Sequence, residues 1–302
     1  MTILVIGGSG FLGRHLCKSL LEDDHQVVVK TRNIEKTRRI FSALKCSPII
    51  IDEFDNLEPY LSCLDNVISL AGASIIDKRW TPSRKQDLID SRTLPLLEIK
   101  EWLTNNNIAI SKLLVGSAIG YYGYSKDPNH EFIENSEPFD DFAHQVCEQV
   151  ETTANKLDRL CDHTVNLRTG VVLGKGGAFN KMALPAKLHL NGKIGNGQQW
   201  VSWIHMHDWV NAVKYILSLD TPRKRYNLTS PQPSTNSELS HAIGSSLNKT
   251  FQIPIPVLSL KLLLGEASIL LTGSQKVLPS NLQAANFEFT YPELQAAVSS
   301  LL

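Results

Sequence analysis

The beginning of the chain carries the pattern that most constrains its fold. An apolar run, Thr2 to Ile6, leads directly into glycines at positions 7, 10 and 13 and then into an amphipathic stretch. The first glycine permits a tight turn, the second lets backbone N–H groups approach a pyrophosphate, and the third lets a helix pack closely on a strand. The segment therefore predicts a βαβ unit that binds a dinucleotide. The residues expected to contact the cofactor here are Gly7, Gly10, Phe11, Leu12 and Gly13.

The second predicted strand indicates which dinucleotide fits. In NAD-specific sites an acidic residue roughly twenty positions after the glycine loop binds the ribose 2′-hydroxyl. Here the strand, Gln26 to Thr31, is followed by Arg32 and ends without a carboxylate. A guanidinium can bind a 2′-phosphate through paired hydrogen bonds, and the Thr31 hydroxyl can add another. These residues favour NADP(H), although a solvated basic turn would also account for them.

Short apolar runs and longer amphipathic stretches alternate through the first half of the chain, a pattern typical of a parallel sheet covered by helices on both faces. The predicted strands are residues 3–6, 26–31, 48–52, 66–70, 112–116 and 164–168, and the predicted helices are 11–21, 34–44, 82–104 and 139–161. After Gly170 the alternation weakens and Gly and Pro become more frequent. We predict an α/β fold with a Rossmann-type doubly wound parallel sheet in residues 1–170. A smaller, mixed α/β C-terminal lobe in residues 171–302 covers the cofactor, and the chain is free to cross back between the two.

Composition narrows the choice of partner and compartment. Thirty basic residues balance thirty acidic ones, so no global field would draw the chain to nucleic acid or an anionic membrane. The five cysteines form no CxxC pair, which fits a reducing cytoplasm better than a disulfide framework or a zinc knuckle. The apolar segment 257–271 is interrupted by Lys261, Gly265 and Glu266 and is too short to span a membrane, so it predicts a buried or interface helix. We expect a small-molecule substrate and a cytoplasmic location, and we leave a homodimer open.

Several later segments are similar to those of one protein family. Residues 70–72 (LAG) follow the fourth predicted strand, residues 116–123 carry Ser117 after the fifth, and residues 167–174 follow the sixth. Residues 203–210 (WIHMHDWV) and 226–228 (YNL) complete the set. Together they resemble the extended or atypical short-chain dehydrogenase/reductases of the NAD-dependent epimerase/dehydratase group. Residues 73–80, 195–205 and 265–292 resemble a subgroup of uncharacterised epimerase-like proteins with its own C-terminal segment.

The resemblance implies further contacts with the cofactor. In the family, the turn after the fourth strand passes the dinucleotide, the crossing after the sixth strand lies near the nicotinamide, and in the subgroup the fourth helix lies beside the adenosine end. For that helix Arg92 has more weight than Asp87, because a cation suits a phosphate, and a surface salt bridge is the alternative for both. The positions implied are Leu70, Ala71, Gly72, Asp87, Arg92 and Val172.

Catalysis in this superfamily normally uses a Ser or Thr, a Tyr and a Lys four residues after the Tyr. Ser117 fits the first role, but no tyrosine occurs from Ser125 to Lys214 and no lysine from Asp127 to Asn155. The formal YxxxK from Tyr122 to Lys126 lies in a loop, where the helical spacing is lost, so we treat it as accidental. The candidate catalytic residues are Ser117 and, as proton donor, Tyr122 or Tyr121.

Two other clusters of His, Cys and Asp residues are explained more simply by structure than by metal binding or catalysis. The string His205-Met206-His207-Asp208 has zinc-like spacing, yet in the family it begins a helix that Asp208 can cap. His144 and Cys147 lie three residues apart on a predicted helix without an orienting third group, which is weak evidence for a reactive pair. We therefore predict no metal site.

Two functions remain open. The first is an NADP-dependent oxidoreductase or epimerase that acts on a small carbonyl or sugar-like molecule with an incomplete Ser-Tyr-Lys triad. The second is a weakly catalytic or non-catalytic NADP(H)-binding regulatory protein, for which the resemblance alone brings a link to cell division.

Overall fold

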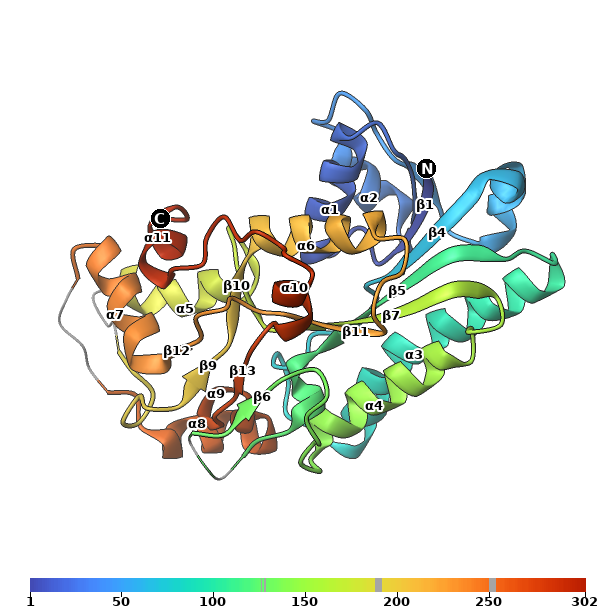
Figure 1. The fold of residues 1–302 in the computed structure, drawn as a ribbon. Coiled ribbons are helices and arrows are strands. Elements are labelled where there is room, and N and C mark those ends of the chain that lie inside the picture. Colours follow the sequence, from blue (N-terminus) through green and yellow to red (C-terminus); the bar gives the residue numbers. More distant parts are fainter. Residues whose placement is uncertain (126, 128, 188–191, 250–253) are drawn as a thin grey trace.

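A seven-stranded parallel sheet forms the centre of the computed structural model, which describes every residue except 126, 128, 188–191 and 250–253 (Figure 1). Its strands are β1 (Thr2–Ile6), β2 (Gln26–Lys30), β3 (Ile49–Ile51), β4 (Leu64–Ser69), β5 (Ile110–Ala118), β7 (Cys161–Thr169) and β11 (Arg225–Leu228). Their order across the sheet is β11-β7-β5-β4-β1-β2-β3, and every neighbouring pair is parallel. The order reverses between β1 and β4, where doubly wound sheets bind ligands at the carboxyl ends of their strands. The predicted fold class is confirmed.

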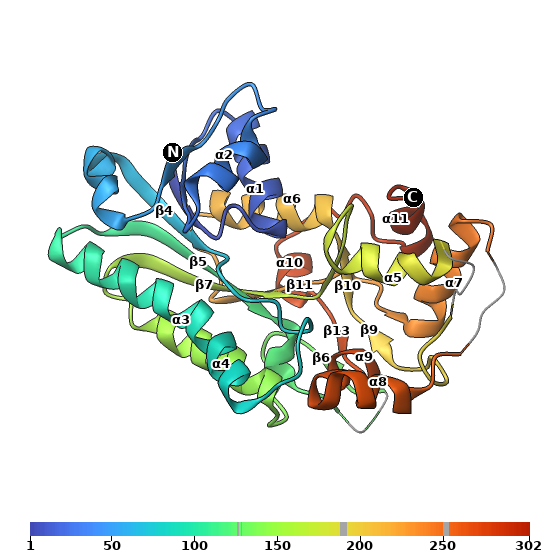
Figure 2. The same cartoon turned by 180° about the vertical axis from the view of Figure 1, so that it is seen from behind.

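The side chains of β1 alternate between two apolar cores, one on each face of the sheet. Ile3 and Val5 pack in the core that α1 (Phe11–Glu22) and α6 (Met206–Ser218) complete. Leu4 and Ile6 pack in the core that α3 (Pro82–Asn105) and α4 (Phe142–Asn155) complete. Figures 1 and 2 show α1, α2 (Ile34–Phe41) and α6 on one side of the sheet and α3 and α4 on the other. A strand that is buried on both faces is apolar throughout, as this one is.

Elements from beyond Gly170 return to the large sheet. Strand β11 pairs with β7 at the edge of the sheet, and Trp209, Val213 and Ile216 of α6 pack in the same core as α1. The segment that follows β7 thus contributes to the cofactor-binding half as well as to the smaller lobe.

The smaller lobe packs α5 (Gly177–Lys187), α7 (Asn236–Ser246) and α11 (Leu294–Ser299) around Phe179, Trp203 and Leu239. Two small sheets pair strands that both follow Gly170: β8 (Val171–Leu173) with β10 (Trp203–His205), and β9 (Trp200–Val201) with β12 (Ser234–Thr235). A third pairs β6 (Glu131–Phe132) of the first half with β13 (Lys276–Val277) and so connects the two parts of the chain. Other short elements include η1 (Phe54–Cys63), η2 (Ile119–Tyr122) and α10 (Ser280–Ala284).

Helix α4 is shorter than predicted, because local hydrogen bonds fix its beginning. The Asp141 side chain accepts a hydrogen bond from the His144 N–H at 2.8 Å and caps the helix, which therefore starts at Phe142 rather than at Phe139. The helix ends at Asn155, six residues before the predicted end at Cys161, which is instead the first residue of β7.

The apolar segment 257–271 does not form the single buried or interface helix that its composition predicts. It is broken into α8 (Val257–Leu264), η3 (Gly265–Ser268) and α9 (Ile269–Thr272), because Gly265 adopts a φ of +62° directly after α8. Leu258, Leu262 and Leu263 are 68, 67 and 69 % exposed. In the part of the chain that the structure describes, no helix is long and apolar enough to cross a membrane.

Candidate functional site

The three glycines of the first loop differ in what surrounds them. Gly7 has a φ of +84°, and a Cβ there would lie 2.7 Å from the Ala71 backbone nitrogen. A Cβ on Gly13 would lie 2.4 Å from the Gly7 carbonyl oxygen, because α1 packs closely on the loop. A Cβ on Gly10 would meet only that same oxygen, at 3.2 Å, and is otherwise in open space. The loop therefore has no room for a side chain at Gly7 or Gly13, whereas Gly10 faces open space.

The start of α1 offers its backbone N–H groups to a ligand. Gly10 is the N-cap, no side chain caps the helix, and no acidic residue lies in its first turn. Unpaired N–H groups and the positive end of the helix dipole favour an anion at this point. The open side of Gly10 leaves room for a pyrophosphate, so a dinucleotide fits the residues present. Phe11 packs against Gly174 and Gly177 of the crossing segment.

At the end of β2 the two residues expected to select the cofactor have different environments. Thr31 is buried, and its hydroxyl accepts hydrogen bonds from the Thr37 hydroxyl at 2.9 Å and the Asn33 N–H at 3.2 Å. Arg32 is exposed at the surface directly after it. No carboxylate occupies the place where an NAD site needs one, because β2 ends at Lys30 and is followed by Thr31 and Arg32.

A cavity of about 180 Å³ lies at the carboxyl ends of β4, β5 and β7. Its walls are Leu12, Leu70, Ala71, Gly72, Ile75, Arg92, Gly116, Ser117, Ala118, Val146, Cys147, Val150 and Thr169. The structure thus brings together six predicted residues, which are Leu12, Leu70, Ala71, Gly72, Arg92 and Ser117. Val172 does not line this cavity and is buried in β8.

Arg92 is the cation of this cavity. Its guanidinium donates hydrogen bonds to the carbonyl oxygens of Ala73 at 2.9 Å and Leu88 at 2.8 Å, and burial lowers its pKa below the ordinary value. Among the described residues no carboxylate forms an ion pair with Arg92. A half-buried cation without a counter-ion favours binding of an anionic group. Asp87 instead lies at the surface of α3, where one of its oxygens is 3.9 Å from an Arg84 nitrogen.

Comparison with known proteins agrees with this geometry. The pattern of the NAD dependent epimerase/dehydratase family matches residues 3–229. The chain belongs to this family. A second pattern, a domain of unknown function (DUF1731), matches residues 255–301, so the expected C-terminal segment of the subgroup is confirmed. As a family member the chain is an NAD(P)-binding, epimerase-like protein.

Individual relatives resemble the chain over its whole length. A chloroplastic SDR39U1 homologue of Arabidopsis thaliana is 35% identical over 307 residues, covering 100% of this chain and 87% of that protein. An epimerase family protein of Staphylococcus aureus is 31% identical over 300 residues, covering 99% and 98%. The crystal structure of human epimerase family protein SDR39U1 with NADPH has a TM-score of 0.87 at 29% identity, covering 100% of this chain and 99% of that one. The UDP-N-acetylglucosamine 4-epimerase of Bacillus cereus shares the fold, with a TM-score of 0.75 at 19% identity.

Tyr122 does not face the cavity where a proton donor of this family would be needed. Its side chain is fully buried, and its hydroxyl donates to the Asn227 side-chain oxygen at 2.7 Å and accepts from Arg168 at 3.0 Å. Burial raises the pKa of Tyr122 to about 12. Its hydroxyl is engaged in the core and the residue is not part of the cavity wall, so its role as proton donor stays a prediction.

Tyr121 is also absent from the cavity wall. Its ring stacks on the guanidinium of Arg168, with the guanidinium carbon 3.4 Å from the ring centroid. The formal YxxxK motif cannot be followed to its end, because Lys126 lies outside the described residues. Neither loop tyrosine therefore lies on the cavity wall that Ser117 lines.

Sequence reasoning missed the charged pair that lies behind Ser117. Ser117 donates a hydrogen bond to Glu151 at 2.9 Å, and Arg168 donates to both oxygens of Glu151 at 2.8 Å each. Glu151 lies on α4, and Arg168 is the β7 residue that pairs in register with Ser117 of β5. The sequence did hold a signal for this pair, because an arginine interrupts an otherwise uncharged run, Thr164 to Thr169. A buried arginine needs an acidic partner.

Cys147 lies on the cavity wall one helical turn before Glu151. Burial, together with the charge of Glu151, raises the pKa of its thiol to about 11, so the thiol is neutral at physiological pH. The thiol donates to the Ala118 carbonyl oxygen. A neutral, buried thiol is a poor nucleophile.

The His205 to Asp208 string begins helix α6, as the resemblance implied, but the cap is different. The His205 side chain is the N-cap acceptor, for the His207 N–H at 3.2 Å. Asp208 instead accepts hydrogen bonds from the N–H groups of Thr290 and Tyr291 and so attaches the C-terminal segment. Within the described part of the chain, no group of three or more His, Cys, Asp or Glu side chains is placed to bind a metal.

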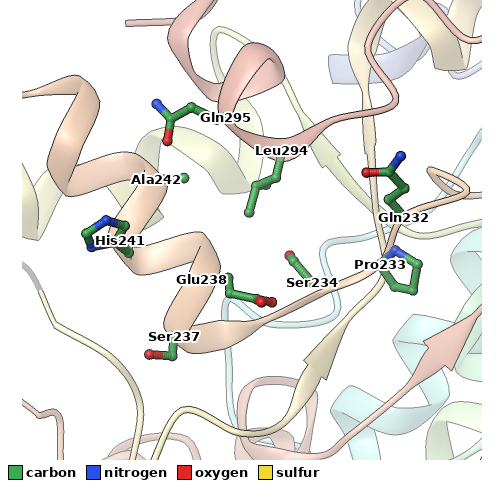
Figure 3. Close-up of a pocket in the computed structure, with 9 residues that line it drawn as sticks. All are labelled: Gln232, Pro233, Ser234, Ser237, Glu238, His241, Ala242, Leu294 and Gln295. Atoms are coloured by element: carbon green, nitrogen blue, oxygen red, sulfur yellow. The ribbon is translucent and has the colours of Figure 1, made fainter.

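A larger hollow of about 530 Å³ lies away from this site, between α7, the start of α11 and the chain before β12 (Figure 3). Figure 3 shows Leu294 pointing into the space between Glu238 and Ser234. Glu238 is engaged in the capping box of α7 with Thr235, and the Gln295 amide bonds to Ser246 and Ser299. None of the predicted site residues lines this hollow, whereas six of them line the smaller cavity at the sheet.

Proposed function

We propose that the chain binds NADP(H) in preference to NAD(H) and uses it as an oxidoreductase or epimerase on a small carbonyl or sugar-like molecule. The observation that carries the cofactor preference is the end of β2, where Arg32 is exposed and no carboxylate is present. A carboxylate there would repel a 2′-phosphate, whereas a guanidinium attracts it. The NADPH in the human relative's crystal structure supports the same choice.

The residues that would hold the cofactor follow from the geometry. The N–H groups at the start of α1 would bind the pyrophosphate, and Arg32 would bind the 2′-phosphate. Arg92, the cation without a partner carboxylate, would bind a further anionic group of the ligand. When bound, the nicotinamide ring supplies hydride transfer, and the protein supplies orientation and a proton path.

The missing Tyr/Lys pair supports the second function, an NADP(H)-binding regulatory protein with little turnover. Where α4 faces the cavity it presents Val146, Cys147 and Val150. A positioned general acid contributes typically ~10²–10⁴-fold to rate. If nothing replaces that acid, binding would remain strong and turnover would be slow, so a panel of aldehydes, ketones and nucleotide sugars separates the two functions.

Calorimetric titration of the purified protein with NADPH and NADH tests the cofactor preference. We expect NADPH to bind at least about tenfold more tightly, which one charge-assisted hydrogen bond can supply. Arg32→Glu should reverse the preference. Arg39→Glu, an equal change of charge at an exposed position on α2, is the control and should leave it in place. Equal affinities in the parent protein would contradict the assignment.

A further inference from the structure

The Ser117 hydroxyl has one proton, and the structure shows where that proton points. The hydroxyl donates to Glu151 Oε1 at 2.9 Å. A hydroxyl that donates in one direction keeps only its lone pairs for the other. Toward the cavity, Ser117 is therefore a hydrogen-bond acceptor.

Arg168 fixes this direction. Glu151 is buried, and both of its oxygens accept hydrogen bonds from Arg168, so its carboxyl group receives the Ser117 proton rather than offering one. Arg168 is itself fully buried and donates further to the Tyr122 hydroxyl and the Glu134 carbonyl oxygen. Rotation of the carboxylate would break two charge-assisted hydrogen bonds in a buried site, so the pair keeps its orientation.

The neighbouring polar groups of the wall also direct their protons away from the cavity. The Cys147 thiol donates to the Ala118 carbonyl oxygen, and the Thr169 hydroxyl donates to the Leu167 carbonyl oxygen at 3.4 Å. Among the side chains of the wall the remaining donor is Arg92, which the proposed function assigns to an anionic group of the ligand. A carbonyl oxygen placed at Ser117 would find no proton there.

We propose that Ser117 receives the reacting group of the substrate as a hydrogen-bond acceptor, so that the cavity selects an alcohol over the matching ketone. This inference rests on the proposed function, because it assumes that the substrate binds in the cavity at the sheet. Glu151 and Arg168 are positioning residues that set the polarity of Ser117. The substrate class is then a secondary alcohol, such as a sugar hydroxyl, bound when the cofactor is oxidised.

Ligand-observed NMR titration of the NADP⁺-loaded protein with cyclohexanol and cyclohexanone tests the proposal without relying on turnover. We expect the parent protein to bind the alcohol about fivefold more tightly, the ratio that one net hydrogen bond supplies. Ser117→Ala should abolish the preference, and Ser117→Thr, which keeps a hydroxyl, should preserve it.

A double variant, Glu151→Leu with Arg168→Met, tests the positioning role. Replacing both partners of a buried ion pair leaves no unpaired charge and is often tolerated. The Ser117 proton would then be free to point into the cavity, so the preference should shift toward the ketone. Retained NADPH binding shows that this variant is folded, and Ser117→Ala keeps the proposal testable if it is not.

The outcomes separate this inference from the function on which it rests. A parent protein that prefers the ketone, or a preference that persists unchanged in Ser117→Ala, would overturn the assignment of Ser117 as an acceptor even with normal NADPH binding. Failure of the parent protein to bind NADPH or NADH would instead refute the proposed function.

Discussion

Replacement of Gly10 by valine should separate cofactor binding from folding. Gly10 has φ −72° and ψ 178°, an extended conformation that valine adopts readily, and a Cβ there meets only the Gly7 carbonyl oxygen at 3.2 Å. The change should therefore lower the free energy of unfolding by about 1 kcal/mol, the usual effect of a single substitution. The branched side chain would occupy the space above the start of α1, where the pyrophosphate needs close contact with backbone N–H groups. Loss of two charge-assisted hydrogen bonds, each worth about 1.5–3 kcal/mol, corresponds to at least a ~100-fold loss of affinity.

Gly13→Ala is the matched comparison for this prediction. Its Cβ would lie 2.4 Å from the Gly7 carbonyl oxygen and 2.6 Å from the Gly8 Cα, both backbone atoms, so helix and loop must move apart. Such overpacking costs typically 1–3 kcal/mol, and each kcal/mol corresponds to roughly 2–4 °C in Tm for a large domain. Calorimetric titration with NADPH and thermal unfolding should show weak binding with a small Tm change for Gly10→Val, and a larger Tm loss for Gly13→Ala. A cooperatively folded Gly10→Val protein that binds NADPH normally would refute the assignment of the loop.

Three further predictions concern buried groups. Tyr122→Phe should reduce the free energy of unfolding by about 1–3 kcal/mol, because it leaves buried hydrogen-bond partners unsatisfied, and it should leave NADPH affinity unchanged; a large loss of affinity would place Tyr122 in the site after all. Burial lowers the pKa of His205 from 6.5 to about 4. The contribution of this shift to the free energy of unfolding, on the order of 3 kcal/mol, is therefore complete above pH 6.5 and is lost as the pH falls toward 4. Chemical denaturation of His205→Gln across this range should show a flatter pH dependence than that of the parent protein. Mass spectrometry after limited iodoacetamide treatment should find the exposed Cys46 and Cys63 modified first, and Cys147 among the slow, buried cysteines; rapid modification of Cys147 at neutral pH would contradict its neutral, buried state.

Much of the cofactor-binding half was predictable because its signals are local. Gly7 needs a positive φ and Gly13 a close helix contact, and both requirements are met within the first 13 residues of the chain. The parallel sheet could be anticipated for the same reason, since apolar runs alternate with amphipathic helices along the chain. The missing carboxylate after β2 is likewise visible in consecutive residues, Lys30 to Arg32.

The contacts among Ser117, Glu151 and Arg168 were decided by tertiary structure alone. Whether Ser117 faces Glu151 depends on how α4 packs on the sheet, and whether Arg168 reaches Glu151 depends on the register that pairs it with Ser117. The burial of Tyr122 likewise depends on contacts with Asn227, 105 positions away in the chain. By itself, the sequence determined the βαβ unit and its glycine loop, because periodicity and backbone conformation act between near neighbours. The direction of the Ser117 proton was decided only when distant charges were buried side by side, where an unpaired charge is costly and each hydrogen bond restricts its partner.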